Sequence, residues 1–359
     1  MDQVIKRSVG INISKSTFTA CVCQKHKGGH LQFSSVGLFN NDNTGYNRFI
    51  RWVRKTGKHL TEVNFLMEAT GVYYESLACH LDKLNLIVNV VLPNTSKHYF
   101  SSLNIKSKTD QLDAKVLSQF AVERRHKQWS RPNPIYLELR SLTRFYVQLQ
   151  ETKTQLNNQK HSKEASEFTH SFIVNLNRKH IKHIDMQIQK VKDRIKLVCK
   201  SDSQLWNKIE KLMSIKGVGL ISVATIVGET LGFEQVKNRK QLASYAGYDV
   251  VHRESGSSIK GKTRISKKGN RYIRNSLFFP AMVACRYNPE LKKCYLRIIK
   301  KKESKMIGQV AIQRKLLLLM YALWKKDEYY QSDYQKKSSS NKTIEATQDS
   351  NFTSLELQI

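Results

Sequence analysis

The chain has 359 residues and carries 61 lysines and arginines against 29 aspartates and glutamates, a formal net charge of +32. Because a compact protein repels itself at such a charge, the excess indicates a polyanionic partner, and we expect nucleic acid. A membrane surface would require a basic amphipathic segment or a lipidation signal, and the sequence shows neither. It also shows no signal peptide, no run of about 18 apolar residues and no disulfide framework, so we expect a reduced, cytoplasmic protein.

Three stretches between Arg7 and Phe39 have the pattern of β-strands: VGINIS, FTACVC and LQFSSVGLF, separated by short polar turns. They predict an antiparallel meander. A helix is expected from about Thr44 to Lys55, then a buried strand in VNFLM, a helix after Gly71, a second strand in LIVNVVL, and a helix from Asp110 to Arg125. This order predicts an α/β domain with an RNase H-like (RuvC-like) fold over residues 1–128.

The middle of the chain carries an apolar seam with alternating spacings of three and four residues, typical of a coiled coil or a long helical hairpin. Its members are Ile181, Ile184, Ile188, Val191, Ile195, Val198, Leu205, Ile209 and Leu212, with Asp202 as a polar interruption, after a weaker seam of Leu139, Leu142, Tyr146 and Leu149. The pattern fits packing within one chain as well as a zipper between two chains. We predict a helical connector over 129–213, a helical C-terminal domain over 214–330, and a disordered tail over 331–359.

Three carboxylates are candidate metal ligands. Glu68 ends the strand NFLME, and Asp110 and Asp113 lie three residues apart at the start of a helix, so they share a face. Oxygen ligands of this kind suit a hard cation such as Mg²⁺, which assists phosphoryl transfer. The alternative is a solvated helix N-terminus, where aspartate is favoured by the helix dipole.

The segment LMSIKGVGLISVATIVGE has the form of a helix-hairpin-helix element, in which Gly217 and Gly219 let backbone N–H groups approach a phosphate. An ordinary tight turn between helices is the alternative. Downstream, a basic loop and helix start carry further cations, and Tyr272 is available to stack. The predicted nucleic-acid-binding residues are Gly217, Gly219, Arg253, Lys260, Lys262, Arg264, Lys267, Lys268, Arg271 and Arg274.

The motifs GINISK, MEATG and KTDQLDA, followed by QLASYAGYDVVHRESGSSIKGKTRISKKGNRYIRNSL, occur in this order along the chain. Together they resemble the signature of the IS110 family of DEDD transposases, insertion-sequence enzymes related to Piv-type DNA invertases. The resemblance extends from about Ser8 to Leu323. It implies an RNase H-like domain that holds Mg²⁺ and a C-terminal domain whose serine attacks DNA. It also implies guidance by a structured RNA from the element, a bacterial nucleoid-associated location, and active sites assembled in a homo-oligomer, a dimer or tetramer.

By this resemblance Glu68, Asp110 and Asp113 are three of the four family acids, and Ser255 is the nucleophile, with Ser257 or Ser258 as alternatives. The fourth acid is replaced, because Asn12 stands where the family motif GIDVSK has aspartate. An amide oxygen can contact a metal but brings no negative charge and cannot act as a base, so we expect weaker cation binding.

Two other motifs are weaker. GSSIKGKT, residues 256–263, satisfies the P-loop expression, but no long strand precedes it and no continuous helix follows. Cys21, Cys23, His26 and His30 have zinc-type spacing, but we expect the cysteines to pack in a core strand.

We therefore predict a DNA transposase or recombinase that cuts and rejoins DNA through a phosphoserine intermediate with Mg²⁺, guided by RNA. One alternative is a catalytically degenerate protein that binds DNA or RNA, which Asn12 favours. The other is an Mg²⁺-dependent nuclease that uses water, in which Ser255 is structural.

Overall fold

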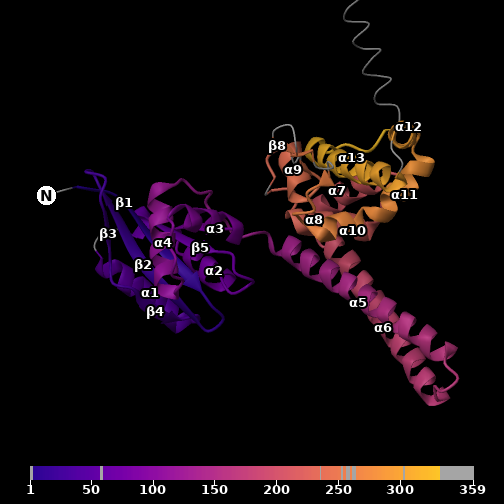
Figure 1. Cartoon of the computed structure of the whole chain (residues 1–359), viewed down its shortest axis with the longest axis horizontal. Coiled ribbons are helices and arrows are strands. Elements are labelled where there is room, and N and C mark those ends of the chain that lie inside the picture. The colour runs from indigo at the N-terminus through magenta and orange to yellow at the C-terminus, as the bar shows by residue number, and fades with distance from the viewer. Residues whose placement is uncertain are drawn as a thin grey trace, which may run out of the picture. The chain divides into compact units, whose positions relative to one another are not determined.

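In the computed structural model, residues 3–56, 60–234, 236–251, 254–255, 259–260, 264–301 and 304–331 are described. The chain divides into two units, Met1–Arg131 and Pro132–Ile359. Figure 1 labels most of the helices and several strands of the two units. The tail predicted over 331–359 lies outside the described residues beyond position 331.

The first unit contains a mixed sheet of six strands in the order β3-β2-β1-β5-β6, with β4 also paired to β2. The strands are β1 (Val4–Ile13), β2 (Thr17–His26), β3 (Leu31–Phe33), β4 (Gly37–Asn40), β5 (Val63–Glu68) and β6 (Ile87–Val91). β1, β2, β3 and β4 pair antiparallel, whereas β5 and β6 continue the sheet in parallel beside β1. This arrangement follows the predicted order of an antiparallel meander and later parallel strands.

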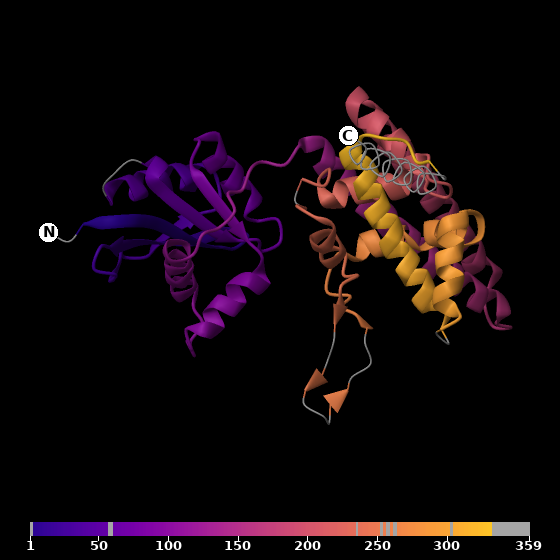
Figure 2. The same ribbon diagram turned by 90° about the horizontal axis from the view of Figure 1, so that it is seen from above.

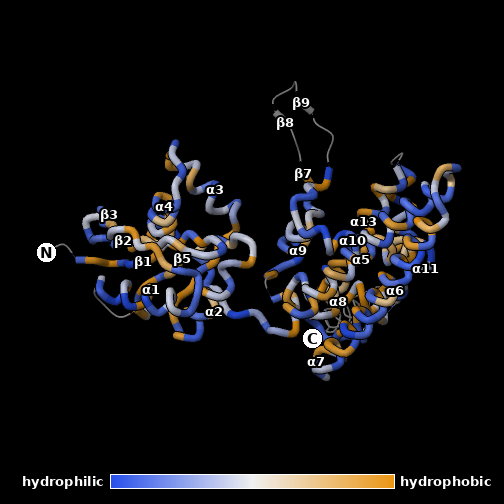
Figure 3. Tube along the Cα trace, turned by 90° about the horizontal axis from the view of Figure 1, so that it is seen from below, coloured by the Kyte–Doolittle hydropathy of each residue, from blue (hydrophilic) through white to orange (hydrophobic). Residues whose placement is uncertain are grey.

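Helices cover both faces of this sheet: α1 (Asn43–Lys55) and α2 (Glu75–Lys83) on one face, α3 (Pro93–Ser102) and α4 (Asp110–Glu123) on the other. A short 3₁₀ helix, Leu60–Glu62, precedes β5. Side chains alternate between the faces along a strand, so Val9 and Ile11 pack toward α1 and α2. Gly10 lies on the opposite face, against α4, where a Cβ added to it would lie 2.0 Å from the Ser118 backbone nitrogen. Figure 3 shows hydrophobic residues gathered along β1, β2 and β5.

Two details differ from the sequence prediction. The stretch LQFSSVGLF forms two short strands instead of one, because Ser34 interrupts the ladder: its hydroxyl accepts a hydrogen bond from the Val22 N–H at 3.0 Å. Helix α3 was not expected. It starts at Pro93, which suits the first turn of a helix, and it buries Ser96 and Tyr99 instead of an apolar stripe.

The second unit is mainly helical. Its elements are α5 (Pro134–Ala165), α6 (Ser171–Lys200), α7 (Ser203–Met213), α8 (Leu220–Thr230), α9 (Arg239–Tyr245), β7 (Val250–Val251), β8 (Glu254–Ser255), β9 (Ile259–Lys260), β10 (Arg264–Ile265), α10 (Arg271–Ser276), α11 (Phe278–Tyr287), α12 (Pro289–Ile299) and α13 (Lys305–Lys326). Helices α5 and α6 form a long hairpin (Figure 1).

The apolar seam predicted from the sequence is buried within this one chain. Ile184, Ile188 and Ile195 of α6 share a cluster with Leu139 and Leu149 of α5. The polar interruption in the seam has a structural reason: α6 ends at Lys200, and the Asp202 side chain caps α7 by accepting from the N–H groups of Gln204 and Leu205.

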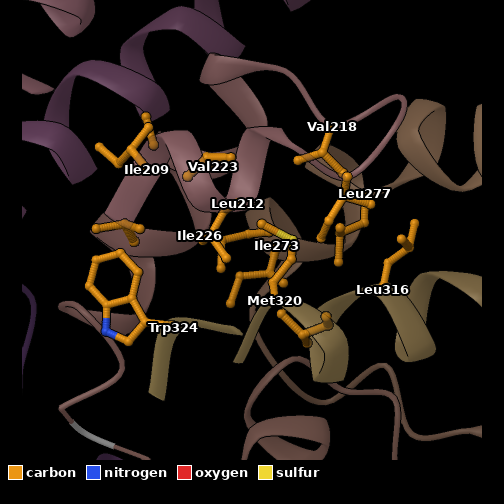
Figure 4. Packing of buried hydrophobic residues seen from close by; sticks show 14 of the residues in the cluster. Ile209, Leu212, Val218, Val223, Ile226, Ile273, Leu277, Leu316, Met320 and Trp324 are labelled. Carbon is orange, nitrogen blue, oxygen red and sulfur yellow. The ribbon is translucent and has the colours of Figure 1, made fainter. Parts of the chain in front are cut away.

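The same cluster continues into the helices that follow, so the hairpin and the C-terminal helices share one hydrophobic core. Figure 4 shows side chains from α7, α8, α10 and α13 directed toward one another, among them Leu212, Ile226, Ile273 and Met320. Helix α13 is long and apolar enough to cross a membrane by length and composition alone, the one such helix in the described residues. Its Leu316 and Met320 are fully buried in this core, which accounts for its apolar composition.

Candidate active site and nucleic-acid interface

Asn12 and Glu68 lie at the same end of two neighbouring strands. β1 and β5 run parallel, with Ile11 opposite Met67, so the next residue on each strand is Asn12 and Glu68. Both are half-buried. They follow Gly10 and Leu66 by two positions, which places them on the α4 face of the sheet.

The N-terminus of α4 brings two more candidate residues to this edge. Thr109 caps the helix by accepting from the Leu112 N–H, which places Asp110 and Asp113 in the first turn. The Asn12 amide donates a hydrogen bond of 3.0 Å from Nδ2 to Oδ1 of Asp110. The structure therefore joins Asn12, which by the resemblance stands in place of a family acid, directly to Asp110.

Glu68 is held by neighbours that the sequence did not reveal. Ser96 is a buried residue in the first turn of α3, and its hydroxyl donates to Glu68 Oε2 at 2.5 Å, while the Thr70 hydroxyl donates to Oε1 at 3.4 Å. These bonds fix the carboxylate orientation. Ser96 could not be recognised beforehand because α3 itself was not predicted.

Asp113 senses the charges of the other two carboxylates. Burial raises the pKa of Asp113, and the negative charges of Asp110 and Glu68 raise it further, against the opposing effect of Lys108. Among the described residues, however, no group of three or more His, Cys, Asp or Glu side chains is close enough to enclose a metal ion. The three acids are therefore neighbours, but their side chains do not surround a common point.

Ser255 lies in a short β-hairpin of the second unit. β7 pairs with β10 through Val251 and Arg264, and farther along the chain Ser255 of β8 is opposite Ile259 of β9. Figure 2 shows the two strand pairs one after the other. For Ser255 and Lys260 only the backbone is described. Arg253, Ser257, Ser258, Lys262 and most of the GSSIKGKT stretch lie outside the described residues.

The base of this hairpin is tied to the helical core. The Ser266 hydroxyl donates to Asp249 Oδ1 at 2.5 Å, and the Ser266 N–H donates to the Asp249 carbonyl at 2.8 Å. Lys267 has a left-handed backbone with φ of 53°, and its N–H donates to the Gly247 carbonyl. These contacts give the loop a defined start and end.

The predicted basic residues divide into two groups. Arg264, Lys267, Lys268 and Arg271 are exposed, and the Arg271 guanidinium lies 5.0 Å from the centroid of the Tyr272 ring. Arg274 is half-buried and donates to the Ala246 carbonyl at 2.8 Å, so it also supports the loop. The exposed group is available to phosphates.

The two glycines of the predicted helix-hairpin-helix element have different surroundings. Gly217 has φ of 94°, and a Cβ there would lie 2.6 Å from Val283, so packing and backbone conformation require glycine. Gly219 precedes α8 and has open space where a Cβ would be. No side chain caps α8, which begins at Leu220.

A buried polar cluster, which we name the Glu229 clamp, connects α5, α8 and the end of the basic loop. Glu229 is completely buried, and Arg144 donates to its two carboxylate oxygens at 2.6 and 2.8 Å. Asn270 donates to Glu229 Oε2 at 2.5 Å, and the Tyr245 hydroxyl donates to the Glu229 carbonyl. The Arg144 guanidinium also lies 4.8 Å from the Tyr272 ring centroid. The sequence signal was a lone acid inside the apolar run ISVATIVGETLGF, and it was missed.

The residues with zinc-type spacing lie on β2, an interior strand of the sheet, and in the turn that follows it. Cys21 and Cys23 are fully buried in β2 and carry free thiols, and burial raises the pKa of both. His26 contacts Gln32 at 3.2 Å and stacks on the His30 ring. The cysteines thus occupy core positions of the strand.

Comparisons with known proteins found matches along most of the chain. Residues 9–163 match a family described as "Transposase", the DEDD transposase domain of IS110 elements, and residues 209–296 match "Transposase IS116/IS110/IS902 family". The pilin gene-inverting proteins of Moraxella bovis and Moraxella lacunata are each 28% identical over 323 residues, covering 89% of this chain and 95% of theirs. A structure of the Aquifex aeolicus Ppx/GppA family member has a TM-score of 0.20 and 16% identity, over 26% of this chain and 37% of that one, too little likeness to support a conclusion.

The chain therefore joins an RNase H-like first unit to a helical second unit. The first unit carries an acidic edge, formed by Glu68, Asp110 and Asp113 beside Asn12. These features are those of an enzyme that rearranges DNA, a transposase or recombinase. The chain belongs to the IS110 family of transposases, as both of its domain matches and its relatives indicate. DNA is its partner, in agreement with the net charge of +32.

Proposed function

We propose that the chain cuts and rejoins DNA by transesterification, with the Ser255 hydroxyl as nucleophile and with Glu68, Asp110 and Asp113 as the acidic centre. One observation carries the acidic half of this proposal. Residues far apart in the sequence, on β1, β5 and α4, come together at one edge of the sheet, where Asn12 donates a hydrogen bond to Asp110 and where burial and the negative charges of Asp110 and Glu68 raise the pKa of Asp113. The position of Ser255 in a hairpin flanked by exposed cations supports the other half.

In the proposed step the Ser255 oxygen forms a bond to the phosphorus of a phosphodiester and gives up its proton. The bond from phosphorus to the departing deoxyribose oxygen breaks, and that oxygen takes up a proton. The number of phosphoester bonds is unchanged, so the strand can be rejoined by the reverse reaction with another deoxyribose hydroxyl. Exposed cations such as Arg264 and Lys268 would stabilise the charge that develops on the phosphate.

The donor set at the acidic edge suits Mg²⁺, which prefers carboxylate and amide oxygens. Glu68, Asp110 and Asp113 would hold the ion, and Asn12 could add a neutral oxygen. When bound, Mg²⁺ would neutralise negative charge on the reacting phosphate. The protein side chains would then have to draw closer together than they lie now, with Ser96 orienting Glu68 as they do so.

Three further properties belong to the same proposal. Phe168, Phe172 and Leu176, at the tip of the α5–α6 hairpin, are 97%, 62% and 50% exposed, and this apolar surface supports association into a homo-oligomer. The open Gly219 and uncapped α8 support phosphate contact by a helix-hairpin-helix element. The large positive charge supports binding of a structured guide RNA in addition to DNA, at the nucleoid.

A covalent-trapping experiment tests the proposal. Labelled DNA from the ends of the encoding element is incubated with Mg²⁺ and the RNA transcribed from the element's flank. The chain is compared with Asn12→Asp and Ser255→Ala, and with Ser304→Ala as a matched control, because Ser304 is an exposed serine of the same unit whose side chain does not cap α13. We expect a protein–DNA adduct that grows with Asn12→Asp, disappears with Ser255→Ala and persists with Ser304→Ala.

The hydrogen bond between Asn12 and Asp110 favours a second candidate function, a protein that binds DNA or RNA without cutting it, because an amide bonded to the site adds no charge for a cation. Tight binding by every variant without any adduct or cleavage would favour this candidate. Cleavage without an adduct, unaffected by Ser255→Ala, would instead indicate an Mg²⁺-dependent nuclease that uses water.

A further inference from the structure

A pocket of about 490 Å³ lies in the second unit where the base of the basic loop meets α10, α11 and α13. Its size falls within the roughly 300–1,000 Å³ of small-ligand sites. Lys267 and Arg274 contribute positive charge, and among the described residues that line it none is acidic. The pocket therefore suits an anionic ligand and offers no counter-charge to a cationic one.

An exposed aromatic ring borders this pocket. Phe279 is 71% exposed, although it is large and apolar, and its ring stands nearly perpendicular to that of Phe278 at a centroid distance of 5.3 Å. Met306, another pocket residue, is 51% exposed. Such side chains offer a planar ligand a stacking surface.

The pocket also contains a buried amide with an unused donor. Gln313 is only 4% exposed, and its Oε1 accepts a hydrogen bond of 2.9 Å from the Tyr248 hydroxyl. In the described part of the chain its amide nitrogen donates to no other residue, so this N–H is available to a ligand in the pocket that accepts a hydrogen bond.

We propose that this pocket binds one unstacked nucleotide of the DNA strand. Its base would stack on Phe279 and accept a hydrogen bond from Gln313, and its phosphate would lie against Lys267 and Arg274. A base that is still paired and stacked is covered on both faces, so the nucleotide must be extruded or single-stranded. The inference rests on the DNA-binding part of the proposed function and is independent of the serine chemistry.

Binding measurements with the full chain in a Ser255→Ala background test the proposal without cleavage. The probes are a matched duplex, the same duplex with one mispaired 2-aminopurine, the same duplex with an abasic site there, and an RNA strand of the same sequence. We expect the mispaired duplex to bind more tightly than the matched one, because its base is cheaper to extrude, and 2-aminopurine fluorescence to change on binding. Phe279→Ala should weaken binding of the mispaired duplex about tenfold, within the range for loss of one base–aromatic stack. It should leave the abasic duplex unaffected.

Three variants make the outcome specific. Phe279→Trp should restore the preference for the mispaired duplex, which a merely folding-related defect would not allow. Tyr287→Ala, on the same helix, 57% exposed and outside the pocket, should have no effect. Lys267→Asn, which tolerates the left-handed backbone, should lower the salt dependence of binding by about one counterion for every DNA probe.

An equal effect of Phe279→Ala on mispaired and abasic DNA overturns the pocket proposal. A Phe279 effect that is confined to RNA overturns it as well, because the pocket would then bind RNA. If the unmodified chain binds none of the DNA probes, the proposed function itself fails, which is a different result from DNA binding without any dependence on Phe279.

Discussion

Replacing Arg144 by methionine tests whether the Glu229 clamp stabilises the second unit. Methionine retains part of the stem's packing but removes the guanidinium, which donates to both carboxylate oxygens at 2.6 and 2.8 Å. The completely buried Glu229 carboxylate then keeps Asn270 as its side-chain donor within the described residues. The Glu229 carboxylate would then be a buried negative charge without a positive partner.

The size of the effect follows from burial. Removing one partner of a buried ion pair costs roughly 3–5 kcal/mol. The Arg144 side chain is 45% exposed, so solvent already weakens the pair, and Asn270 still donates; we therefore expect a loss of about 2–3 kcal/mol. For a unit of this size each kcal/mol of unfolding free energy lost lowers Tm by about 2–4 °C. The Tm of the second unit should therefore fall by about 4–12 °C.

Calorimetry and urea unfolding at neutral pH measure this loss, and a double-mutant cycle isolates the pair. Arg144→Met combined with Glu229→Gln should be less destabilised than the sum of the two single variants, because the double variant leaves no unpaired charge. Arg194→Met is a matched control, since that arginine pairs with Glu138 at the surface and should cost at most about 1 kcal/mol. A loss below about 1 kcal/mol for Arg144→Met, or strict additivity in the cycle, would refute the reasoning.

Three other predictions follow from local geometry. Gly10→Ala forces a Cβ into the α4 backbone and should destabilise the first unit by about 3 kcal/mol or more in urea unfolding, whereas Gly219→Ala meets open space and should change stability by less than about 0.5 kcal/mol. Asp110→Asn removes a neighbouring negative charge and should lower the pKa of Asp113, followed by carboxyl ¹³C NMR. Burial raises the pKa of Cys23 to about 12, so iodoacetamide at pH 8 should label it in urea but not in the native protein.

Each of these has a clear contrary result. Equal stability of the Gly10 and Gly219 variants would mean that β1 and α4 can separate at no cost. An unchanged Asp113 titration would show that Asp110 does not reach it. The raised pKa of Asp113 also predicts how stability depends on pH. Ionisation of this carboxyl is less favourable in the folded state, so its contribution to the free energy of unfolding falls as pH rises from the ordinary carboxyl range through the raised pKa. Rapid native labelling of Cys23 would show that β2 is accessible.

The acidic edge could be anticipated from the sequence because its geometry follows from simple rules. Glu68 ends an apolar strand, where its side chain was expected to emerge, and in the structure the parallel neighbour β1 places Asn12, which only the resemblance had marked, beside it. The spacing of Asp110 and Asp113 fixed their common helix face. Their bonding partners were not predictable, because the hydrogen bond from Ser96 depends on a helix without an apolar stripe.

The second unit was less predictable for a related reason. Its helices were expected from periodicity, but Asp202 looked like a defect in a seam when it is the cap that separates α6 from α7. Glu229 looked like the end of an apolar helix, and its partners Arg144 and Asn270 lie 85 and 41 residues away in the sequence. Periodicity describes which face of a helix is buried, but it does not say which distant polar group a buried charge will meet.

Asn12 shows how one residue can alter both the stability and the chemistry of such a site. With aspartate at this position, four carboxylates would face one another across β1, β5 and α4, and their repulsion would oppose assembly of the edge. Asparagine replaces one repulsion by a hydrogen bond of 3.0 Å to Asp110, which draws β1 and α4 together without a cation. In the metal site that we propose, the same residue would also remove a charge that a cation meets. Easier assembly of the acidic edge and stronger cation binding would therefore be opposed at position 12.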